Sequence, residues 1–107
     1  MEDIPTHLLV DGAKFACNAK AIPFFIRQKG DLSRGTMMVV LMDLQGEAQV
    51  FRQERNLDFV LGWKTEGLMR ERNAEKMIQT ALGRDPDQWI IEIEDPQMNF
   101  PFEGPRF

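Results

Sequence analysis

An uninterrupted apolar run from Met37 to Met42 constrains this chain more than any other feature of its sequence. Such a run of uncharged apolar residues is typical of a strand that is covered on both faces. Residues 43–46 then supply turn-forming side chains, and residues 47–52 return as a second strand. We therefore predict a β-hairpin over residues 36–52, and the fold has to be a sheet built around it.

Further strands are predicted on both sides of this hairpin. Residues 24–29 are rich in aromatic and β-branched side chains, which favour strands. The last predicted strand alternates, so that Trp89, Ile91 and Ile93 share one face. The predicted strands cover residues 24–29, 36–44, 47–53 and 88–94, and residues 57–63 are a candidate for a short additional strand.

Two segments have the periodicity of amphipathic helices. The first begins at Thr6, whose hydroxyl can cap a free backbone N–H, and it ends before Pro23. The second covers residues 68–82 and is followed by Gly83, a residue type that often ends helices. The predicted apolar side of the first helix consists of Leu8, Leu9, Ala13, Phe15, Ala16 and Ala19.

The 107 residues are enough for one domain, since domains cluster at roughly 100–150 residues. Strands joined by tight turns favour an α+β two-layer sandwich, with an antiparallel sheet of four to five strands and two helices on one face. Within this single domain, 1–107, we expect residues 95–107 to form an irregular, proline-rich tail. The residues expected to be buried are Phe15, Phe25 or Ile26, Val39 or Val40, Leu41, Met77, Leu82, Trp89, Ile91 and Ile93.

The charge of the chain argues against several classes of function. Lys and Arg number 13 against 17 Asp and Glu, so the net charge is −4 and the basic surplus typical of nucleic-acid binders is missing. The first residues are acidic where a signal peptide is basic. No apolar run approaches the roughly 20 residues needed to span a bilayer. We therefore expect a cytoplasmic protein that binds neither nucleic acid nor membrane.

The single cysteine, Cys17, and the single histidine, His7, argue against catalysis. On one helix they would lie ~15 Å apart along its axis, so they cannot act as a nucleophile and its base. A lone cysteine also excludes an intramolecular disulfide and a Cys-based zinc cluster. We predict no catalytic residue, no metal site and no cofactor, and we expect Cys17 to be a small buried thiol.

Two motifs carry a family resemblance. Arg27-Gln28-Lys29-Gly30-Asp31, with Gly35 a few residues on and an apolar strand after it, forms a strand–Gly-Asp–Gly–strand pattern. Residues 84–95 contain Asp-Pro-Asp-x-Trp, followed by two apolar residues and Glu-Ile-Glu-Asp. In this order and at this distance, the motifs resemble the small bacterial proteins grouped as Domain of Unknown Function family 1491, over roughly residues 7–98. The resemblance implies one complete domain, and it brings no established activity.

The loop between the first two predicted strands is the first candidate site. Its two glycines, hydroxyl pair and flanking cations can cradle an anion with backbone N–H groups. It is not a P-loop, because neither a Lys-Ser/Thr pair nor a helix follows the Gly-x₄-Gly spacing. The alternative is an ordinary turn in which glycine supplies a positive φ. The candidate anion-binding residues are Arg27, Lys29, Gly30, Ser33, Arg34 and Gly35.

An acidic cluster near the last predicted strand is the second candidate site. Glu92 and Glu94 share a strand face with Cα atoms about 6.7 Å apart, a spacing that can hold Mg²⁺ or Ca²⁺ or divide acid and base roles. The alternative, which we favour, is that cations on neighbouring strands hold these carboxylates. The cluster comprises Asp85, Asp87, Glu92, Glu94 and Asp95, and the candidate cations are Arg27, Lys29 and Arg52.

Apolar side chains in the tail and the hairpin are candidate partner-binding residues. Phe100, Phe102 and Phe107 lie among prolines, which exclude a helix or a central strand. They therefore either fold back over the domain or dock on another chain. Three methionines of the hairpin either form an adaptable surface or pack in the core; they are Met37, Met38 and Met42.

Two functions from different classes follow from these features. The first is a non-catalytic interaction module that associates with itself or with another protein, because a nucleophile and a transition-metal set are missing while aromatic and Met side chains are plentiful. The alternative is a small-anion or phosphate-binding protein, or an enzyme, centred on the loop of residues 30–35.

Overall fold

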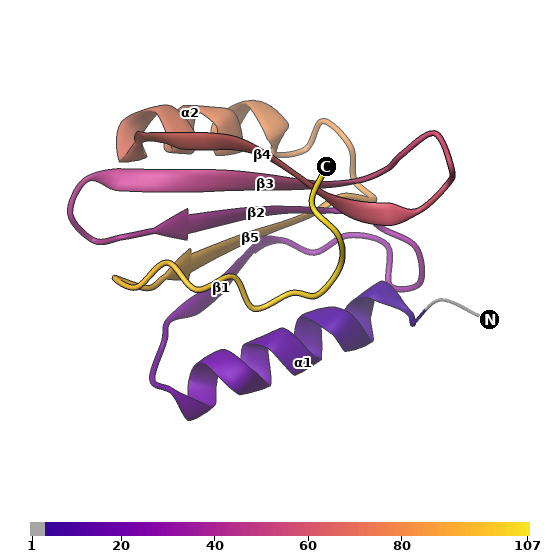
Figure 1. The fold of residues 1–107 in the computed structure, drawn as a ribbon, viewed down its shortest axis with the longest axis horizontal. Coiled ribbons are helices and arrows are strands. Elements are labelled where there is room, and N and C mark those ends of the chain that lie inside the picture. The colour runs from indigo at the N-terminus through magenta and orange to yellow at the C-terminus, as the bar shows by residue number, and fades with distance from the viewer. Residues whose placement is uncertain (1–3) are drawn as a thin grey trace.

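A computed structural model describes residues 4–107 as two helices and one sheet (Figure 1). The elements are α1 (Thr6–Ala19), β1 (Phe24–Gln28), β2 (Met37–Met42), β3 (Glu47–Arg55), β4 (Leu61–Arg70), α2 (Glu71–Ala81) and β5 (Trp89–Glu94). Neither helix is long and apolar enough to cross a membrane. The α+β class is confirmed, and the four predicted strands and both helices are present with shifted ends.

The five strands form one open sheet in the order β1-β5-β2-β3-β4. Neighbouring strands are antiparallel except for the central pair, β2 and β5, which run parallel. The parallel pair arises because α2 carries the chain from the edge strand β4 back to the middle of the sheet. The sheet is therefore mixed, and most of its pairs are antiparallel as predicted.

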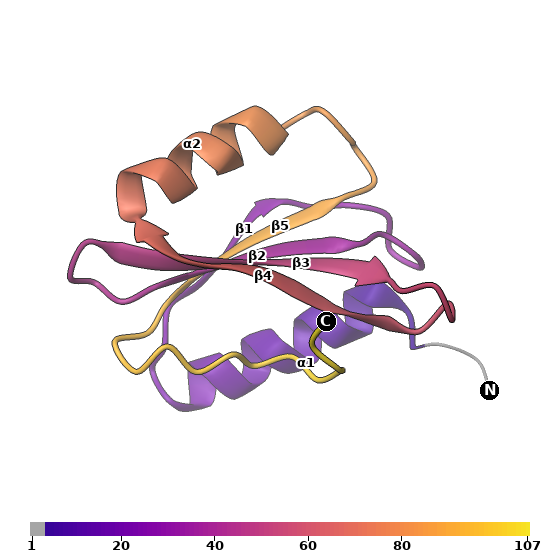
Figure 2. The same ribbon diagram turned by 45° about the horizontal axis from the view of Figure 1, so that its top comes forward.

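The two helices lie on opposite faces of the sheet (Figure 2), so their predicted placement on one face is wrong. β2 explains the arrangement, since all of its residues are buried. Val39 and Leu41 belong to the core on the α1 side, whereas Met38 and Val40 belong to the core on the α2 side. A strand that is apolar on both faces needs a cover on each.

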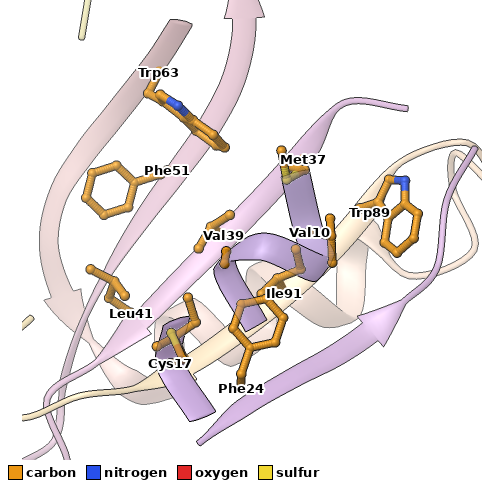
Figure 3. Packing of buried hydrophobic residues seen from close by; sticks show 12 residues of the cluster. Val10, Cys17, Phe24, Met37, Val39, Leu41, Phe51, Trp63, Trp89 and Ile91 are labelled. Atoms are coloured by element: carbon orange, nitrogen blue, oxygen red, sulfur yellow. The ribbon is translucent and has the colours of Figure 1, made fainter. Parts of the chain in front are cut away.

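The core on the α1 side joins the helix, the sheet and the C-terminal tail. Val10 and Cys17 of α1 lie near Phe24 of β1 and the central strands (Figure 3). Farther along the same face, Phe100 of the tail stacks on Phe51 of β3 with ring centroids 4.1 Å apart. The buried members are Val10, Ala13, Cys17, Phe24, Met37, Val39, Leu41, Phe51, Trp63, Trp89, Ile91 and Ile93.

The core on the α2 side is smaller. Ala74 and Ile78 are the buried residues of α2, and they pack against the face of the sheet that contains Ile90. The buried members are Met38, Val40, Met42, Ala48, Val50, Ala74, Ile78 and Ile90. All three hairpin methionines are therefore core residues, and the idea that they form a partner surface is wrong.

α1 is rotated relative to the prediction. The expected core residue Phe15 is 77% exposed, because the helix turns a stripe of smaller side chains toward the sheet. A hydrogen bond from the Thr6 hydroxyl to the Gly35 carbonyl, 2.9 Å long, holds the start of the helix in this rotation. The buried residues of α1 are Thr6, Val10, Ala13 and Cys17.

Edge positions explain the other differences in the core. Phe25 and Ile26 are 45% and 38% exposed because β1 is an edge strand whose one buried side chain is Phe24. Met77 and Leu82 are only partly buried, against the α2-side core. The remaining expected core residues, Val39, Val40, Leu41, Trp89, Ile91 and Ile93, are buried as predicted.

β4 differs most from its prediction. The short strand suggested for residues 57–63 is instead a ten-residue strand, Leu61–Arg70, and α2 begins after it at Glu71. Residues 64–70 pair with β3 along the outer edge of the sheet. Their side chains alternate between exposed and half-buried, so they lack the apolar pattern that identifies a strand in the sequence.

Candidate functional site

The 30–35 loop (residues 30–35) fastens the start of α1 to the sheet. The backbone N–H groups of Thr6 and His7 donate to the carbonyls of Ser33 and Leu32 at 3.2 and 2.9 Å. The predicted capping role of Thr6 is wrong: the N-cap position is Pro5, without a side-chain cap. The Thr6 hydroxyl donates to the loop instead of accepting from the helix. Carbonyl groups of the loop therefore accept hydrogen bonds from N–H groups at the helix start, which have no partner within the helix.

Four of the backbone N–H groups of the 30–35 loop are already used within the chain. The Asp31 carboxylate accepts hydrogen bonds from the backbone N–H groups of Ser33 and Arg34, at 3.2 and 2.7 Å. The N–H of Gly35 donates to the Asp31 carbonyl, and that of Asp31 donates to the Asp87 carbonyl. Asp31 thus occupies the place that an external anion would take, which argues against the predicted backbone cradle.

The two loop glycines serve close packing. A Cβ atom on Gly30 or Gly35 would collide with the carbonyl oxygen of Asp87, and neither glycine has a positive φ. The indole N–H of Trp89 donates to the Asp31 carbonyl at 2.8 Å and closes the same contact from the sheet side. The predicted turn with glycine in a left-handed conformation is therefore wrong, because close approach of two backbone segments requires glycine here.

Arg27 belongs to an ion-pair network with α2. Its guanidinium donates to both carboxylate oxygens of Glu75 at 3.0 Å and to Glu92 at 2.7 Å. The hydrogen bonds to Glu75, and secondarily to Glu92, raise the pKa of Arg27. Arg27 in turn lowers the pKa of Glu75. The structure thus confirms Arg27 as the cation that holds Glu92, and it separates Arg27 from the other candidate anion ligands.

Two other members of the acidic cluster, Asp85 and Asp95, have separate structural tasks. Asp85 accepts the N–H of Asp87 at 3.0 Å. Asp95 is buried and accepts the N–H groups of Gln97 and Asn99, so it shapes the turn into the tail. Within residues 4–107, no three His, Cys, Asp or Glu side chains are grouped so that they could hold a metal ion.

Arg52 and Lys29 are the two other cations predicted to hold this acidic cluster. Arg52 pairs with Glu66 of β4 at 3.2 Å, so its expected pairing with Glu92 or Glu94 is wrong. Lys29 is exposed at the end of β1.

Cys17 is a buried thiol, as predicted. Burial, and secondarily the negative charge of Asp95, raise its pKa. The thiol therefore stays protonated at neutral pH, where a nucleophilic cysteine needs the thiolate.

A cavity of about 870 Å³ lies beside the 30–35 loop, where α1 begins and β3 and β4 are joined. Sequence reasoning identified three of its lining residues, Ser33, Arg34 and Gly35, but as part of a different site. It missed the polar residues that β3 contributes, because strand pairing brings them in from a distant segment. Within residues 4–107, the lining residues are Ile4, Pro5, Thr6, Leu9, Ser33, Arg34, Gly35, Thr36, Gln53, Arg55 and Leu61.

The turn between β3 and β4 projects at the same end of the molecule (Figure 1). This 56–60 turn (residues 56–60) is held by Asn56, whose side-chain oxygen accepts the N–H groups of Asp58 and Val60 at 2.9 and 3.0 Å. Leu57 and Phe59 are 98% and 80% exposed. Phe59 has a φ of 62°, a conformation that is unfavourable for a bulky residue. The turn is thus a fixed structure that displays large apolar side chains.

Comparison with known proteins identifies the family. A family model described as a protein of unknown function, DUF1491, matches residues 4–103. The chain belongs to the DUF1491 family. The predicted family is confirmed, and the match includes the described residues that line the cavity and the whole 56–60 turn.

Solved structures share the fold of this DUF1491 chain. A crystal structure of a DUF1491 family protein from Caulobacter crescentus CB15 has a TM-score of 0.86 at 22% identity, covering 98% of this chain and 100% of that one. An NMR structure of a DUF1491 family protein from the same organism has a TM-score of 0.84 at 21% identity, covering 100% and 99%. A solution structure of a protein from A. tumefaciens has a TM-score of 0.74 at 13% identity, covering 99% and 100%. No curated protein matches the chain.

In this DUF1491 chain the C-terminal tail folds back over the domain. Phe100 and Phe102 pack on the α1-side core, and the Arg106 guanidinium lies 5.1 Å from the ring centroid of Phe51. The N–H of Trp63 donates to the Pro105 carbonyl, and the N–H of Phe107 donates to the Trp63 carbonyl. Of the two alternatives predicted for the tail phenylalanines, folding back over the domain is therefore correct for Phe100 and Phe102. Phe107 keeps 46% of its surface exposed.

Proposed function

We propose that this protein is a non-catalytic interaction module that self-associates through the 56–60 turn. The observation that carries the proposal is the exposure of Leu57 and Phe59, at 98% and 80%, on a turn that hydrogen bonds hold in place. Large apolar side chains on a fixed scaffold are typical anchors of protein interfaces, because little conformational entropy is lost when they are buried.

The polar residues around the turn support pairing with a second copy. Glu54 and Asp58 carry negative charge beside the positive charge of Arg55. A two-fold interface sets the same patch against itself, so a patch with both signs of charge can align opposite charges across the axis while the apolar side chains meet.

Size-exclusion chromatography with light scattering over a range of concentrations tests the proposal. We expect a concentration-dependent dimer for the natural chain and a monomer for the double variant Leu57→Ser, Phe59→Asn. Asparagine suits the left-handed conformation at position 59, so the turn is retained.

The matched control is Leu44→Asn in the turn between β2 and β3. Like Phe59, Leu44 is an exposed apolar residue with a positive φ; it is 54% exposed and its φ is 64°. It lies at the other end of β3. This control variant should dimerise like the natural chain. A natural chain that stays monomeric at millimolar concentration, or a double variant that still dimerises, would refute self-association through this turn.

A further inference from the structure

We infer that Phe107 is the second anchor of the self-association surface and packs against the 56–60 turn of the partner copy. This role rests on the proposed self-association, and it adds the C-terminal tail to the interface. Dimerisation then depends on how the tail is held on the domain.

The 56–60 turn is too small to hold a dimer by itself. An interface of standard size buries about 800 Å² on each partner and takes roughly 20–30 residues a side, so further surface has to lie next to the turn. Val60, at 45% exposure, continues the apolar patch toward β4. Phe107 lies beside the first half of β4 and keeps 46% of its surface exposed.

Hydrogen bonds fasten the end of the tail to this half of β4. The N–H of Phe107 donates to the Trp63 carbonyl at 2.9 Å, and the N–H of Trp63 donates to the Pro105 carbonyl at 2.8 Å. Between these bonds, Arg106 forms a parallel bridge with Trp63 and places its guanidinium over the Phe51 ring. Both ribbon views place the end of the tail beside β4 (Figures 1 and 2). The backbone of Phe107 is therefore positioned before a partner arrives.

Gly62 makes room for the Phe107 ring. A Cβ atom at position 62 would lie 2.6 Å from this ring and 2.5 Å from the Pro105 carbonyl oxygen, so a larger residue would displace the end of the tail. Gly62 is three residues from Phe59, which puts their Cα atoms at most about 11 Å apart. An area of about 800 Å² is roughly 30 Å across, so Phe107 and Phe59 fall within one patch.

Two-fold symmetry determines which side chains meet. In a two-fold interface, a side chain meets its own copy only when it lies on the axis. Phe59 and Phe107 occupy separate places in the patch, so one axis that crosses the interface cannot pass through both. An axis between them sets Phe107 of each copy against the 56–60 turn of the other, and this contact then occurs twice in the dimer. Paired aromatic rings also contribute beyond their buried area.

Analytical ultracentrifugation of the full chain measures the dimer Kd and tests this contact. We expect Phe107→Ser to raise the Kd at least about tenfold, because each dimer loses an aromatic anchor twice. Gly62→Ala should also raise the Kd at least about tenfold, because it displaces the end of the tail while Phe107 itself is kept. Together the two variants separate the position of the ring from its mere presence.

The matched control is Leu68→Ser, near the other end of β4. Leu68 is 65% exposed, more than Phe107, but it lies close to the start of α2 and away from the 56–60 turn. This variant should leave the Kd unchanged. Circular dichroism verifies that each variant is folded, and Phe107→Ser decides the test if Gly62→Ala does not fold.

An unchanged Kd in a folded Phe107→Ser variant overturns the role of Phe107. The proposed self-association survives that result if the double variant Leu57→Ser, Phe59→Asn is still monomeric. An equal rise in the Kd for Leu68→Ser would also overturn the role of Phe107, since any lost apolar side chain would then have the same effect. A natural chain that stays monomeric at millimolar concentration overturns both proposals.

Discussion

Replacing Arg27 by methionine tests how the sheet and α2 are joined. The guanidinium of Arg27 links β1 to Glu92 of β5 and to Glu75 of α2. Methionine keeps much of the aliphatic length and removes the charge and all of these hydrogen bonds. The carboxylate of Glu92 would then lose its cation in a half-buried position.

The exposure of each partner sets the size of the effect. The Arg27 and Glu92 side chains are 27% and 14% exposed. Removing one partner of a fully buried pair costs about 3–5 kcal/mol, whereas an exposed pair contributes about 0.2–1 kcal/mol. We therefore expect Arg27→Met to lower the free energy of unfolding by about 2 kcal/mol at pH 7. Glu75, at 40% exposure, should account for only about 0.5 kcal/mol of this.

The Glu75 part of this contribution should depend on pH. Arg27, followed by Gln79, lowers the pKa of Glu75 in the folded state from its ordinary value of 4.5. A carboxyl group with a lowered folded-state pKa stabilises the fold above the unfolded-state pKa, and that stability is lost as the pH falls through the folded-state pKa. The cost of Arg27→Met should therefore be largest at neutral pH and should shrink below about pH 4.

Urea denaturation at pH 7 and pH 3, with double-mutant cycles, measures these terms. The cycle of Arg27→Met with Glu92→Gln should give the larger coupling energy, and the cycle with Glu75→Gln the smaller one. Arg52→Met is the control, because the Arg52–Glu66 pair is more than 40% exposed on both sides and should contribute less than about 0.5 kcal/mol. An equal cost of Arg27→Met at both pH values would contradict a charge-dependent contribution of Glu75.

Three further substitutions and one chemical reaction test the packing. Gly35→Ala should lower the free energy of unfolding by about 2 kcal/mol or more because its Cβ would meet a backbone carbonyl. Gly12→Ala, with open space around its Cβ, should raise it by up to about 1 kcal/mol, and equal effects in thermal denaturation would contradict this contrast. Phe100→Ala should cost about 3 kcal/mol by the same measurement, and a loss below about 1 kcal/mol would show that the tail is loosely attached. Cys17 should react with a thiol reagent far more slowly in the folded chain than in urea, and similar rates would refute its burial.

The local elements of the fold could be predicted from the sequence, whereas the rotation of α1 could not. Strands and helices follow from short-range patterns, which the run from Met37 to Met42 shows most clearly. A strand that is apolar on both faces also implies that both faces of the sheet are covered. The prediction that both helices lie on one face conflicts with this implication. The rotation of α1 depends on a long-range hydrogen bond between Thr6 and Gly35, which helical periodicity does not contain.

The candidate site was only partly predictable for the same reason. The glycine-containing loop points to Ser33 and Arg34 as anion ligands, but their backbone N–H groups donate hydrogen bonds to the Asp31 carboxylate. Gln53 and Leu61 reach the cavity through the pairing of β3 with β4, for which no local motif exists. The apolar residues of the 56–60 turn were interpreted as a strand, because a turn that displays apolar side chains has the composition of a buried segment.

The position of β5 determines when this chain can finish folding. β1 has β5 as its one hydrogen-bonded neighbour, and Phe24 pairs with Ile93 across most of the sequence. During synthesis, the hairpins of β2, β3 and β4 can form first, while β1 has no strand to join until β5 leaves the ribosome. Pairing of such distant segments is slow. The nascent chain therefore carries an unpaired β1 and an incomplete core until β5 has been made, and such exposed strand edges favour association with other nascent chains.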